Sequence, residues 1–254
     1  MASRSSGRGS LPLALVRLVL LFALLAALLV PHVLVRIATG RSPVAHLFLA
    51  AAARIIGLRI RRIGPRPPVR SLLIANHPSW LDILAMGVAT RCAFVSKAEV
   101  RDQWLLGWLA DQQETLYVRR EDRRAVAAQI AAVADRFDHH MPLAVFPEGT
   151  TSAPEGMRPF RPALLSAVTP PPPNSHLIPV AIDYGADRDF VLWTDGESGL
   201  DNARRILGRW RAARVAVRML EPIDPGTDRK QLAERARAEI DAALKASPAA
   251  PPAL

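Results

Sequence analysis

The sequence predicts an α/β fold with a mixed central sheet flanked by helices, preceded by an N-terminal hydrophobic membrane helix or helical hairpin. Beyond Arg59, short apolar runs alternate with longer segments of helical periodicity, which is typical of a sheet covered by helices. Half of the 254 residues are hydrophobic and 22% are charged, so the chain can supply a packed core. A nearly unbroken apolar stretch close to the N-terminus adds a separate hydrophobic element.

This first apolar stretch runs from Leu11 to Val30 and is interrupted only by Arg17. A helix of that length spans roughly 30 Å, the thickness of the hydrocarbon core of a bilayer. We interpret it as an uncleaved anchor, because it is longer than the apolar part of a usual signal peptide. Pro31 is expected to kink or end the helix. A shorter stretch, Val44 to Leu58, is predicted to lie in the membrane interface or to return as the second arm of a hairpin.

The remaining elements are predicted from hydrophobic periodicity. Short apolar runs bounded by turn residues are predicted to be strands: Ser71–Ala75, Ala93–Ser96, Thr115–Val118, Leu143–Phe146, Leu177–Ile182, Phe190–Thr194 and Val215–Leu220. Longer amphipathic segments are predicted to be helices: Leu81–Ala89, Trp104–Asp111, Arg123–Phe137, Ala163–Val168, Asn202–Ala212 and Arg229–Ala246.

The charge balance points to an anionic partner. The chain carries 33 Lys and Arg against 23 Asp and Glu, a formal net charge of +10. The arginines are scattered and no nucleic-acid module accompanies them, so we expect an anionic membrane surface as a partner and no nucleic acid. The single cysteine, Cys92, excludes an intramolecular disulfide and is expected to be a structural thiol in a buried strand.

The first motif, Asn76-His77-Pro78-Ser79-Trp80-Leu81-Asp82, follows an apolar strand and precedes a helix. Inside one helix, His77 and Asp82 would project about 140° apart. Pro78 disfavours a helical conformation at His77, so we expect His77 in the turn, with Asp82 reaching back from the helix. A carboxylate in that position would orient the imidazole as a general base. The alternative is a helix N-terminus with a solvated histidine.

A second motif, Phe146-Pro147-Glu148-Gly149-Thr150, also leaves an apolar strand. Taken alone it fits either a site or a structural turn. Between the two motifs, a predicted strand ends in Arg119 and Arg120. Arginine suits bidentate binding of a phosphate, although exposed arginines at strand ends are common.

Together these segments resemble the glycerolipid acyltransferase family, whose best-known members acylate lysophosphatidic acid. Residues 76–82 are similar to its NHxSxxD block, which contains the HX4D motif, and residues 146–150 to its FPEGT block. Tyr117 to Arg120 resembles the FIxR block, with Arg120 at the arginine position, and Ile178-Pro179-Val180 the IPV block. The resemblance covers about residues 70 to 183, and the blocks occur in order.

The resemblance implies transfer of an acyl group from acyl-CoA or an acyl carrier protein to the sn-2 hydroxyl of lysophosphatidic acid. His77 would deprotonate the acceptor and Asp82 would orient His77. The residues expected to bind substrate are Arg120 and Lys97 for the phosphate, Glu148, Gly149 and Thr150 for the glycerol part, and Ser79 from the first block. Because a thioester is already activated, we expect neither a cofactor nor a metal.

The same interpretation divides the chain into a disordered N-terminus (1–10), membrane-anchoring helices (11–57), an acyltransferase catalytic domain (58–247) and a disordered tail (248–254). Basic residues are denser after the first apolar stretch than before it. The positive-inside rule therefore predicts a catalytic domain on the cytoplasmic side of the inner membrane.

Two departures from the family pattern leave the acceptor open. Thr151 stands where the family often has arginine, and Arg161 stands where it commonly has lysine. Another lysolipid, such as lyso-ornithine lipid, is the alternative acceptor. A non-catalytic membrane-peripheral scaffold is a further alternative, although a scaffold has no need of both His77 and Asp82.

Overall fold

The computed structural model describes residues 9–40, 42–118, 135, 141–165, 174–193, 196–224 and 228–246. Several predictions fall outside these residues: nearly all of the helix Arg123–Phe137, the end of the helix Ala163–Val168, the tail and most of the N-terminal segment.

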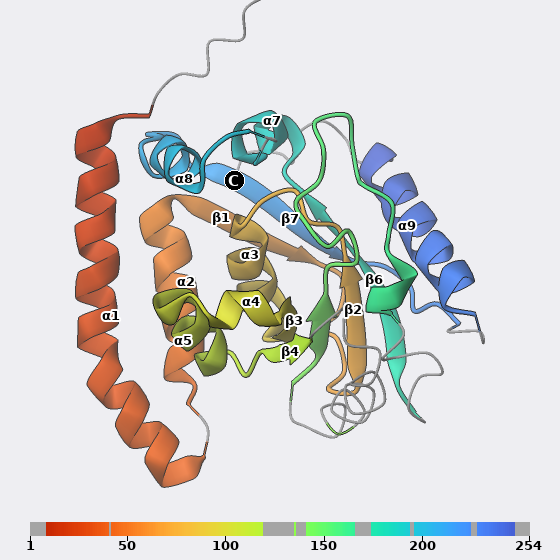
Figure 1. Cartoon of the computed structure of the whole chain (residues 1–254), viewed down its shortest axis with the longest axis horizontal. Helices are drawn as coiled ribbons and strands as arrows, with labels where there is room; N and C mark the ends of the chain where they lie inside the picture. The colour runs from red at the N-terminus through yellow and green to blue at the C-terminus, as the bar shows by residue number, and fades with distance from the viewer. Residues whose placement is uncertain are drawn as a thin grey trace, which may run out of the picture.

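The described residues form one seven-stranded sheet with the strand order β1-β7-β6-β2-β5-β3-β4 (Figure 1). Its strands are β1 (Leu58–Ile63), β2 (Ser71–Ala75), β3 (Ala93–Lys97), β4 (Leu116–Val118), β5 (Leu143–Val145), β6 (His176–Asp183) and β7 (Ala213–Met219). Of the neighbouring pairs among these strands, β6 and β7 are antiparallel and the others are parallel. The predicted mixed sheet is therefore confirmed.

Helices cover both faces of the sheet. Along β2, Leu73 and Ala75 pack with α2 (Val44–Ile56) and α3 (Leu81–Thr90) on one face. Leu72 and Ile74 point to the other face, where they pack in a second core with α9 (Arg229–Lys245). All of β2 is buried, because successive side chains of a strand alternate between two covered faces.

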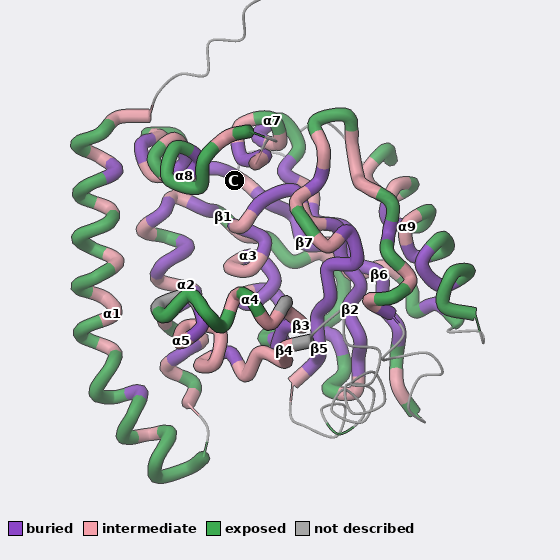
Figure 2. The backbone as a smooth tube through the Cα atoms, in the orientation of Figure 1, coloured by how far each residue is buried: buried purple, intermediate pink, exposed green. Residues whose placement is uncertain are grey.

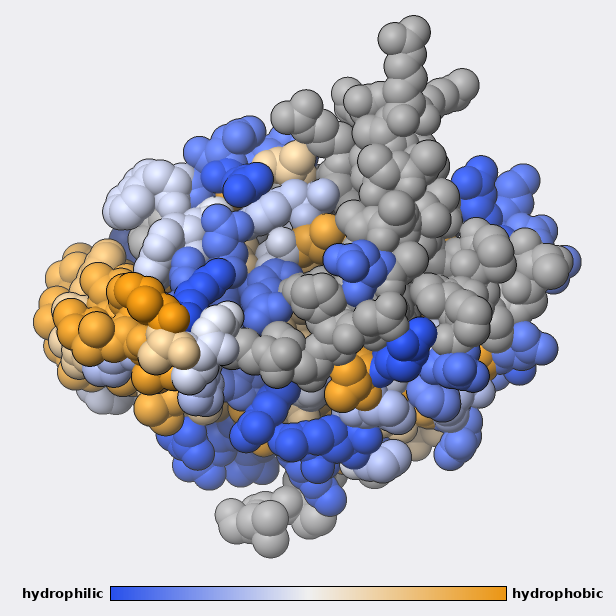
Figure 3. All heavy atoms as spheres, turned by 90° about the horizontal axis from the view of Figure 1, so that it is seen from below, coloured by the Kyte–Doolittle hydropathy of each residue, from blue (hydrophilic) through white to orange (hydrophobic). Residues whose placement is uncertain are grey.

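The N-terminal apolar stretch forms α1 (Leu11–Thr39), which continues through Pro31 instead of ending there. It packs against α2, so the two helices form the predicted hairpin (Figure 1). α1 is long and apolar enough to cross a membrane, and only 6% of its most apolar window is buried. Figure 2 shows it mostly exposed, and Figure 3 shows hydrophobic residues gathered on the side of the molecule where α1 lies. These features are consistent with membrane association.

Polar contacts hold α1 against the domain at both ends. Near its start, the Arg17 guanidinium donates hydrogen bonds to the carbonyls of Leu207 (2.9 Å) and Arg209 (2.8 Å), at the end of α8 (Gly199–Leu207). Near its end, His32 and Arg36 both contact the Gln112 side chain, at 2.8 and 2.7 Å. Gln112 is the last residue of α5 (Trp104–Gln112).

The structure corrects the prediction in four places. The described start of the predicted helix Ala163–Val168 is the 3-10 turn η1 (Pro162–Leu164). The predicted strand Phe190–Thr194 is wrong, because its described part begins in the short helix α7 (Arg188–Val191). A short apolar run does not distinguish a strand from a buried helical turn. β1 was not predicted, since its alternating arginines resemble a basic segment. α8 starts before the predicted first residue Asn202 and ends before the predicted last residue Ala212, because Ser198 caps its first turn and Gly208 follows its last.

Three further short elements complete the described structure. They are α4 (Ala98–Arg101), the 3-10 turn η1 (Pro162–Leu164) and the 3-10 turn η3 (Gly185–Asp187).

Candidate active site

The site lies where β2, β5 and β6 end. These three strands are parallel neighbours, so their carboxyl ends meet at one edge of the sheet. His77 follows β2, Phe146 follows β5 and Tyr184 follows β6. The carboxyl edge of a parallel sheet is where α/β proteins commonly place their ligand sites.

His77 and Asp82 are in direct contact. The His77 Nδ1 atom lies 2.8 Å from Asp82 Oδ2. His77 is in the turn after β2, and Asp82 is in the first turn of α3, which starts at Leu81. This is the spatial arrangement expected from Pro78, which keeps His77 out of the helix so that the carboxylate can reach back to it.

Asp82 is fully buried and surrounded by hydrogen-bond donors. Oδ2 accepts the backbone N–H of Ser79 at 2.8 Å, and Oδ1 accepts the Tyr184 hydroxyl at 2.7 Å. Burial raises the pKa of Asp82, while the hydrogen bonds and charge of His77, together with the bonds from Ser79 and Tyr184, oppose that rise. The donors are placed so that they stabilise a carboxylate in an apolar core.

The loop after β5 holds the backbone of His77 from both sides. The His77 N–H donates to Glu148 Oε1 at 2.7 Å, and the His77 carbonyl accepts the N–H of Ser152 at 2.7 Å. The Ser152 hydroxyl also donates to Glu148, at 2.8 Å. The Phe146 ring stacks on the imidazole with centroids 4.2 Å apart. His77 is therefore fixed by its backbone, its ring face and its Nδ1 atom.

Glu148 is 1% exposed and is engaged within the protein. Besides His77 and Ser152, it accepts the backbone N–H of Arg158 at 2.7 Å. Burial raises its pKa, whereas these hydrogen bonds and the charge of His77 lower it. Ser79 is also fully buried, and its hydroxyl accepts the N–H of Leu81 at 3.4 Å.

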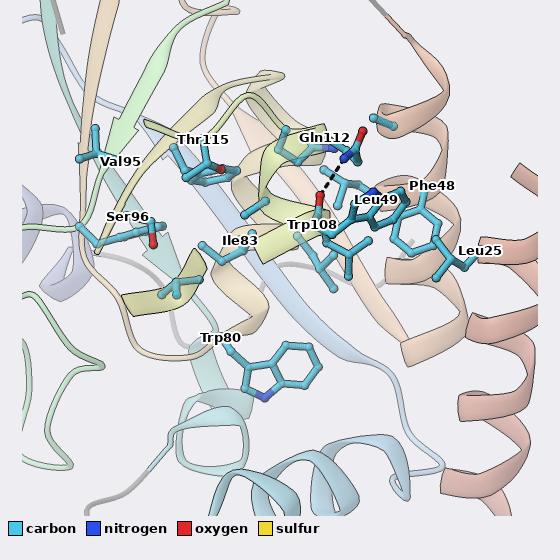
Figure 4. Close-up of a pocket in the computed structure, with 18 of the residues that line it drawn as sticks. Leu25, Phe48, Leu49, Trp80, Ile83, Val95, Ser96, Trp108, Gln112 and Thr115 are labelled. Carbon is cyan, nitrogen blue, oxygen red and sulfur yellow. Dashed lines mark hydrogen bonds between the residues drawn. The ribbon is translucent and has the colours of Figure 1, made fainter. Parts of the chain in front are cut away.

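A pocket of about 500 Å³ opens beside His77, within the range of ligand pockets. Its walls come from α1, α2, α3, α5 and the loops after β2 and β5 (Figure 4). Side chains from these helices include Leu25, Phe48, Ile83 and Trp108, so the lining is predominantly apolar. Trp80 is also part of the wall, and its indole N–H donates to Asn202 at 2.9 Å.

The structure brings together some of the predicted site residues. Gly149 and Thr150 line the pocket with His77, and Gly149 adopts a positive φ of 74° in the turn. Ser79 and Glu148 are not among the described residues that line it. Arg120 and the side chain of Lys97 lie outside the described part of the chain. Their assignment to a phosphate stays a prediction.

Sequence reasoning did not assign roles to Tyr184, Phe146 or Ser152. Tyr184 directly follows β6, which runs parallel to β2 at the adjacent position. That placement is a signal that identifies it once the strand order is known, because parallel neighbours end at the same edge. Within the described residues, no group of three His, Cys, Asp or Glu side chains is arranged to hold a metal ion.

Comparisons with known proteins agree with this geometry. The family model described as Acyltransferase matches residues 59–183. The chain is 34% identical over 202 residues to the lyso-ornithine lipid O-acyltransferase of Pseudomonas aeruginosa, covering 78% of this chain and 76% of the relative. It is 35% identical over 118 residues to the 1-acyl-sn-glycerol-3-phosphate acyltransferase of Neisseria gonorrhoeae, covering 46% of each.

A solved structure has the same fold. The crystal structure of the 1-acyl-sn-glycerophosphate acyltransferase from Thermotoga maritima superposes with a TM-score of 0.59 at 20% identity, over 79% of this chain and 77% of that one. The fold and the family match together define an enzyme of the acyltransferase class. The chain belongs to the acyltransferase family that includes lyso-ornithine lipid and 1-acyl-sn-glycerol-3-phosphate acyltransferases.

Proposed function

We propose that the chain transfers a fatty acyl group from a thioester carrier to a hydroxyl of a lysolipid, with His77 as the general base. The observation that carries this proposal is the 2.8 Å contact between His77 and the fully buried Asp82, at the edge of an apolar pocket. A histidine oriented by a carboxylate is suited to take a proton from a hydroxyl near neutral pH.

The hydrogen bonds around Asp82 define the working tautomer of His77. Asp82 accepts from Ser79 and Tyr184, so it faces His77 as an acceptor, and Nδ1 carries the proton. Nε2 is then the basic nitrogen. It takes the hydroxyl proton of the acceptor while the oxygen attacks the thioester carbonyl. The C–O bond forms, the C–S bond breaks and the thiolate leaves, taking the proton from His77.

The apolar pocket is suited to a fatty acyl chain. Each buried methylene contributes about 0.8 kcal/mol, so a long chain in this pocket would be strongly held. The carbonyl end would then lie beside His77, which is part of the pocket wall. The acyl donor is acyl-CoA or acyl carrier protein, and the reaction needs no cofactor or metal, because the thioester is already activated.

Two acceptors fit this chemistry. Lyso-ornithine lipid is favoured by the extent of similarity, since relatives named for it match 73% to 78% of this chain, against 38% to 46% for those named for 1-acyl-sn-glycerol-3-phosphate. Thr151 stands where the family often has arginine, so this position offers no cation to an acceptor phosphate. Transfer to the sn-2 hydroxyl of lysophosphatidic acid is the second candidate, supported by the fold neighbour and by Arg120.

We further propose that α1 lies along the surface of the inner membrane, with the catalytic domain on the cytoplasmic side. α1 is about 44 Å long and is held to the domain near both ends, by Arg17 and by His32 and Arg36. A helix crossing the bilayer while so held would carry the arginines of α8 into hydrocarbon, which is costly. When α1 lies in the membrane interface, its exposed apolar side chains contact lipid.

Purified protein in anionic vesicles, given labelled acyl-CoA or acyl carrier protein and a panel of lysolipids, tests the proposal. We expect label to be transferred to lyso-ornithine lipid faster than to lysophosphatidic acid. A reversed preference would select the second acceptor, and an Arg120→Ala variant would then show a raised KM for it. Absence of label in every lysolipid would contradict the proposed function.

A further inference from the structure

We propose that Tyr184 is a positioning residue of the His77–Asp82 pair, holding Asp82 in the orientation and charge state in which it supports His77. The inference rests on the proposed function, because it assigns Tyr184 a part in the same reaction. Tyr184 lies 102 positions from Asp82 in the sequence and belongs to none of the motifs that identify the site.

The contact is short and enclosed. The Tyr184 hydroxyl lies 2.7 Å from Asp82 Oδ1, and Tyr184 and Asp82 are 3% and 0% exposed. Oδ2 is already shared by His77 Nδ1 and the N–H of Ser79. Tyr184 therefore supplies the hydrogen bond to the second oxygen. Without it, that oxygen would be left in an apolar core, where an unsatisfied charged acceptor is unfavourable.

The end of β6 is held in place for this contact by a second pair of hydrogen bonds. The Asn76 side chain donates to the carbonyl of Ile182 at 3.0 Å and accepts its N–H at 2.7 Å. Asn76 immediately precedes His77, and Ile182 lies two residues before Tyr184. These two hydrogen bonds join the turn that contains His77 to the end of β6. The strand therefore positions the Tyr184 side chain against Asp82.

The hydrogen bond runs from the phenol to the carboxylate. Burial, together with the charge of Asp82, raises the pKa of Tyr184 well above its ordinary value, so the hydroxyl keeps its proton and donates. The groups facing the pair are His77 from the turn after β2, Tyr184 from the end of β6, and Glu148 from the loop after β5, which faces His77. Among these, Tyr184 is the neutral donor that spreads the charge of Asp82 over both oxygens.

Removing the hydroxyl shifts the pH dependence of the reaction in one direction. The hydrogen bond from Tyr184 lowers the pKa of Asp82, so its removal raises that pKa further. Asp82 then takes up a proton at a higher pH, and His77 loses its charged partner at the acid end of the rate profile. The acid limb of the rate profile therefore moves to higher pH.

The test is Tyr184→Phe, which keeps the ring and deletes one oxygen. We expect kcat to fall about tenfold with the KM of both substrates unchanged. General-base catalysis typically contributes about 10²–10⁴-fold in rate, and the orientation of the base accounts for part of that contribution. The acid limb of kcat should move up by about one pH unit, because losing a hydrogen bond to a charged group changes the pKa of that group by about this amount. An unchanged kcat and an unchanged acid limb would overturn the proposal.

Thr90→Val is the matched control. Thr90 is 1% exposed, lies on the same helix as Asp82, and donates its hydroxyl to the carbonyl of Met86 at 2.8 Å, away from the pair. This variant deletes a buried hydroxyl without touching Asp82. We expect it to keep the wild-type acid limb. If Thr90→Val shifts the acid limb of the kcat profile as much as Tyr184→Phe does, the shift reflects general stability and the proposal is wrong.

A measurement without turnover separates this proposal from the proposed function. In protein with ¹⁵N-labelled histidine, the Nδ1–H resonance of His77, assigned by its loss in His77→Gln, reports the bond to Asp82. We expect the resonance to shift in Tyr184→Phe and to stay in place in Thr90→Val. A resonance at the wild-type position in Tyr184→Phe would overturn the coupling, whether or not the protein transfers acyl groups.

Discussion

Glu148 accepts the backbone N–H of His77 at 2.7 Å, so the loop after β5 supports the turn that presents the imidazole. The family resemblance predicts that Glu148 binds the acceptor, whereas its carboxylate is 1% exposed and bonded to three protein donors. This arrangement suggests that Glu148 acts by positioning His77.

Glu148→Gln separates these two roles. The amide places an N–H₂ group against one of the three donors, so we expect a loss of about 1–3 kcal/mol in the free energy of unfolding. We also expect a lower kcat with an unchanged KM for the acceptor. Denaturant unfolding and steady-state kinetics check both quantities. Glu155→Gln, at an exposed position of the same loop, is the control. A raised KM with normal kcat and stability would show that Glu148 binds the acceptor instead.

Asp82→Asn should separate activity from stability. Burial raises the pKa of Asp82 above its ordinary 3.8, so the folded state holds that proton more tightly than the unfolded state does. The stability that the protonated group contributes is present below pH 3.8 and is lost as pH rises through the raised pKa. An amide has no charge to desolvate and fits the same partners, with the Tyr184 oxygen accepting its N–H.

We therefore expect Asp82→Asn to lose activity by about 10²–10⁴-fold while its Tm at pH 7 equals or exceeds that of the wild type. The difference in Tm should be smallest near pH 4 and grow towards neutral pH. Thermal unfolding across this range checks the sign. A variant whose Tm falls further below the wild type as pH rises would contradict the account of a desolvated carboxylate.

The pocket should limit the length of the acyl chain. Ala45 lies on α2, is buried and lines the pocket, so Ala45→Phe fills part of its volume. Excluding two methylenes costs about 1.6 kcal/mol, so kcat/KM for the longest donors should fall about tenfold relative to short ones. A chain-length series of acyl-CoA measures this. Leu47→Phe, on the exposed side of the same helix, should leave the preference unchanged. Equal effects of both variants would argue against an acyl pocket.

The attachment of α1 can be tested through Arg17. Its guanidinium bonds two carbonyls at the end of α8, where a positive charge is favourable. Arg17→Leu should lower the free energy of unfolding by about 1–3 kcal/mol and increase hydrogen exchange in the last turn of α8. Arg54→Leu is the matched control, because Arg54 is exposed and bonds a carbonyl of its own helix, α2. Unchanged exchange in Arg17→Leu would mean that this contact does not hold α1 to the domain.

The sequence predicts the parts of this site that depend on local chemistry. The contact between His77 and Asp82 follows from Pro78 and a separation of five residues, so turn geometry is enough to predict it. Most strands were predicted to within two residues at each end, because alternating burial on a sheet leaves a readable pattern. Val191 illustrates the limit, since it is fully buried in a helical turn and its short apolar run resembles a strand.

The remaining features depend on which distant segments meet. Tyr184 reaches Asp82 only because β6 lies next to β2, and strand order is a property of the whole sheet. Likewise, Glu148 is placed with the substrate-binding residues by its motif, and its burial becomes evident only when β5 is seen beside β2. Pro31 is a different case, because it predicts either a kink or an end of the helix, and the structure excludes only the end, since α1 continues through it.

Whether His77 is the general base is tested most directly by comparing wild type with His77→Ala in the same anionic vesicles. The quantity measured is the initial rate of acyl transfer from labelled acyl-CoA to the preferred lysolipid, with vesicle binding and Tm recorded for both proteins. We expect His77→Ala to bind vesicles and unfold like the wild type, and its rate to fall by at least about 10²-fold, the loss expected when a general base is removed. A folded, vesicle-bound His77→Ala protein that transfers acyl groups at the wild-type rate would contradict this role of His77.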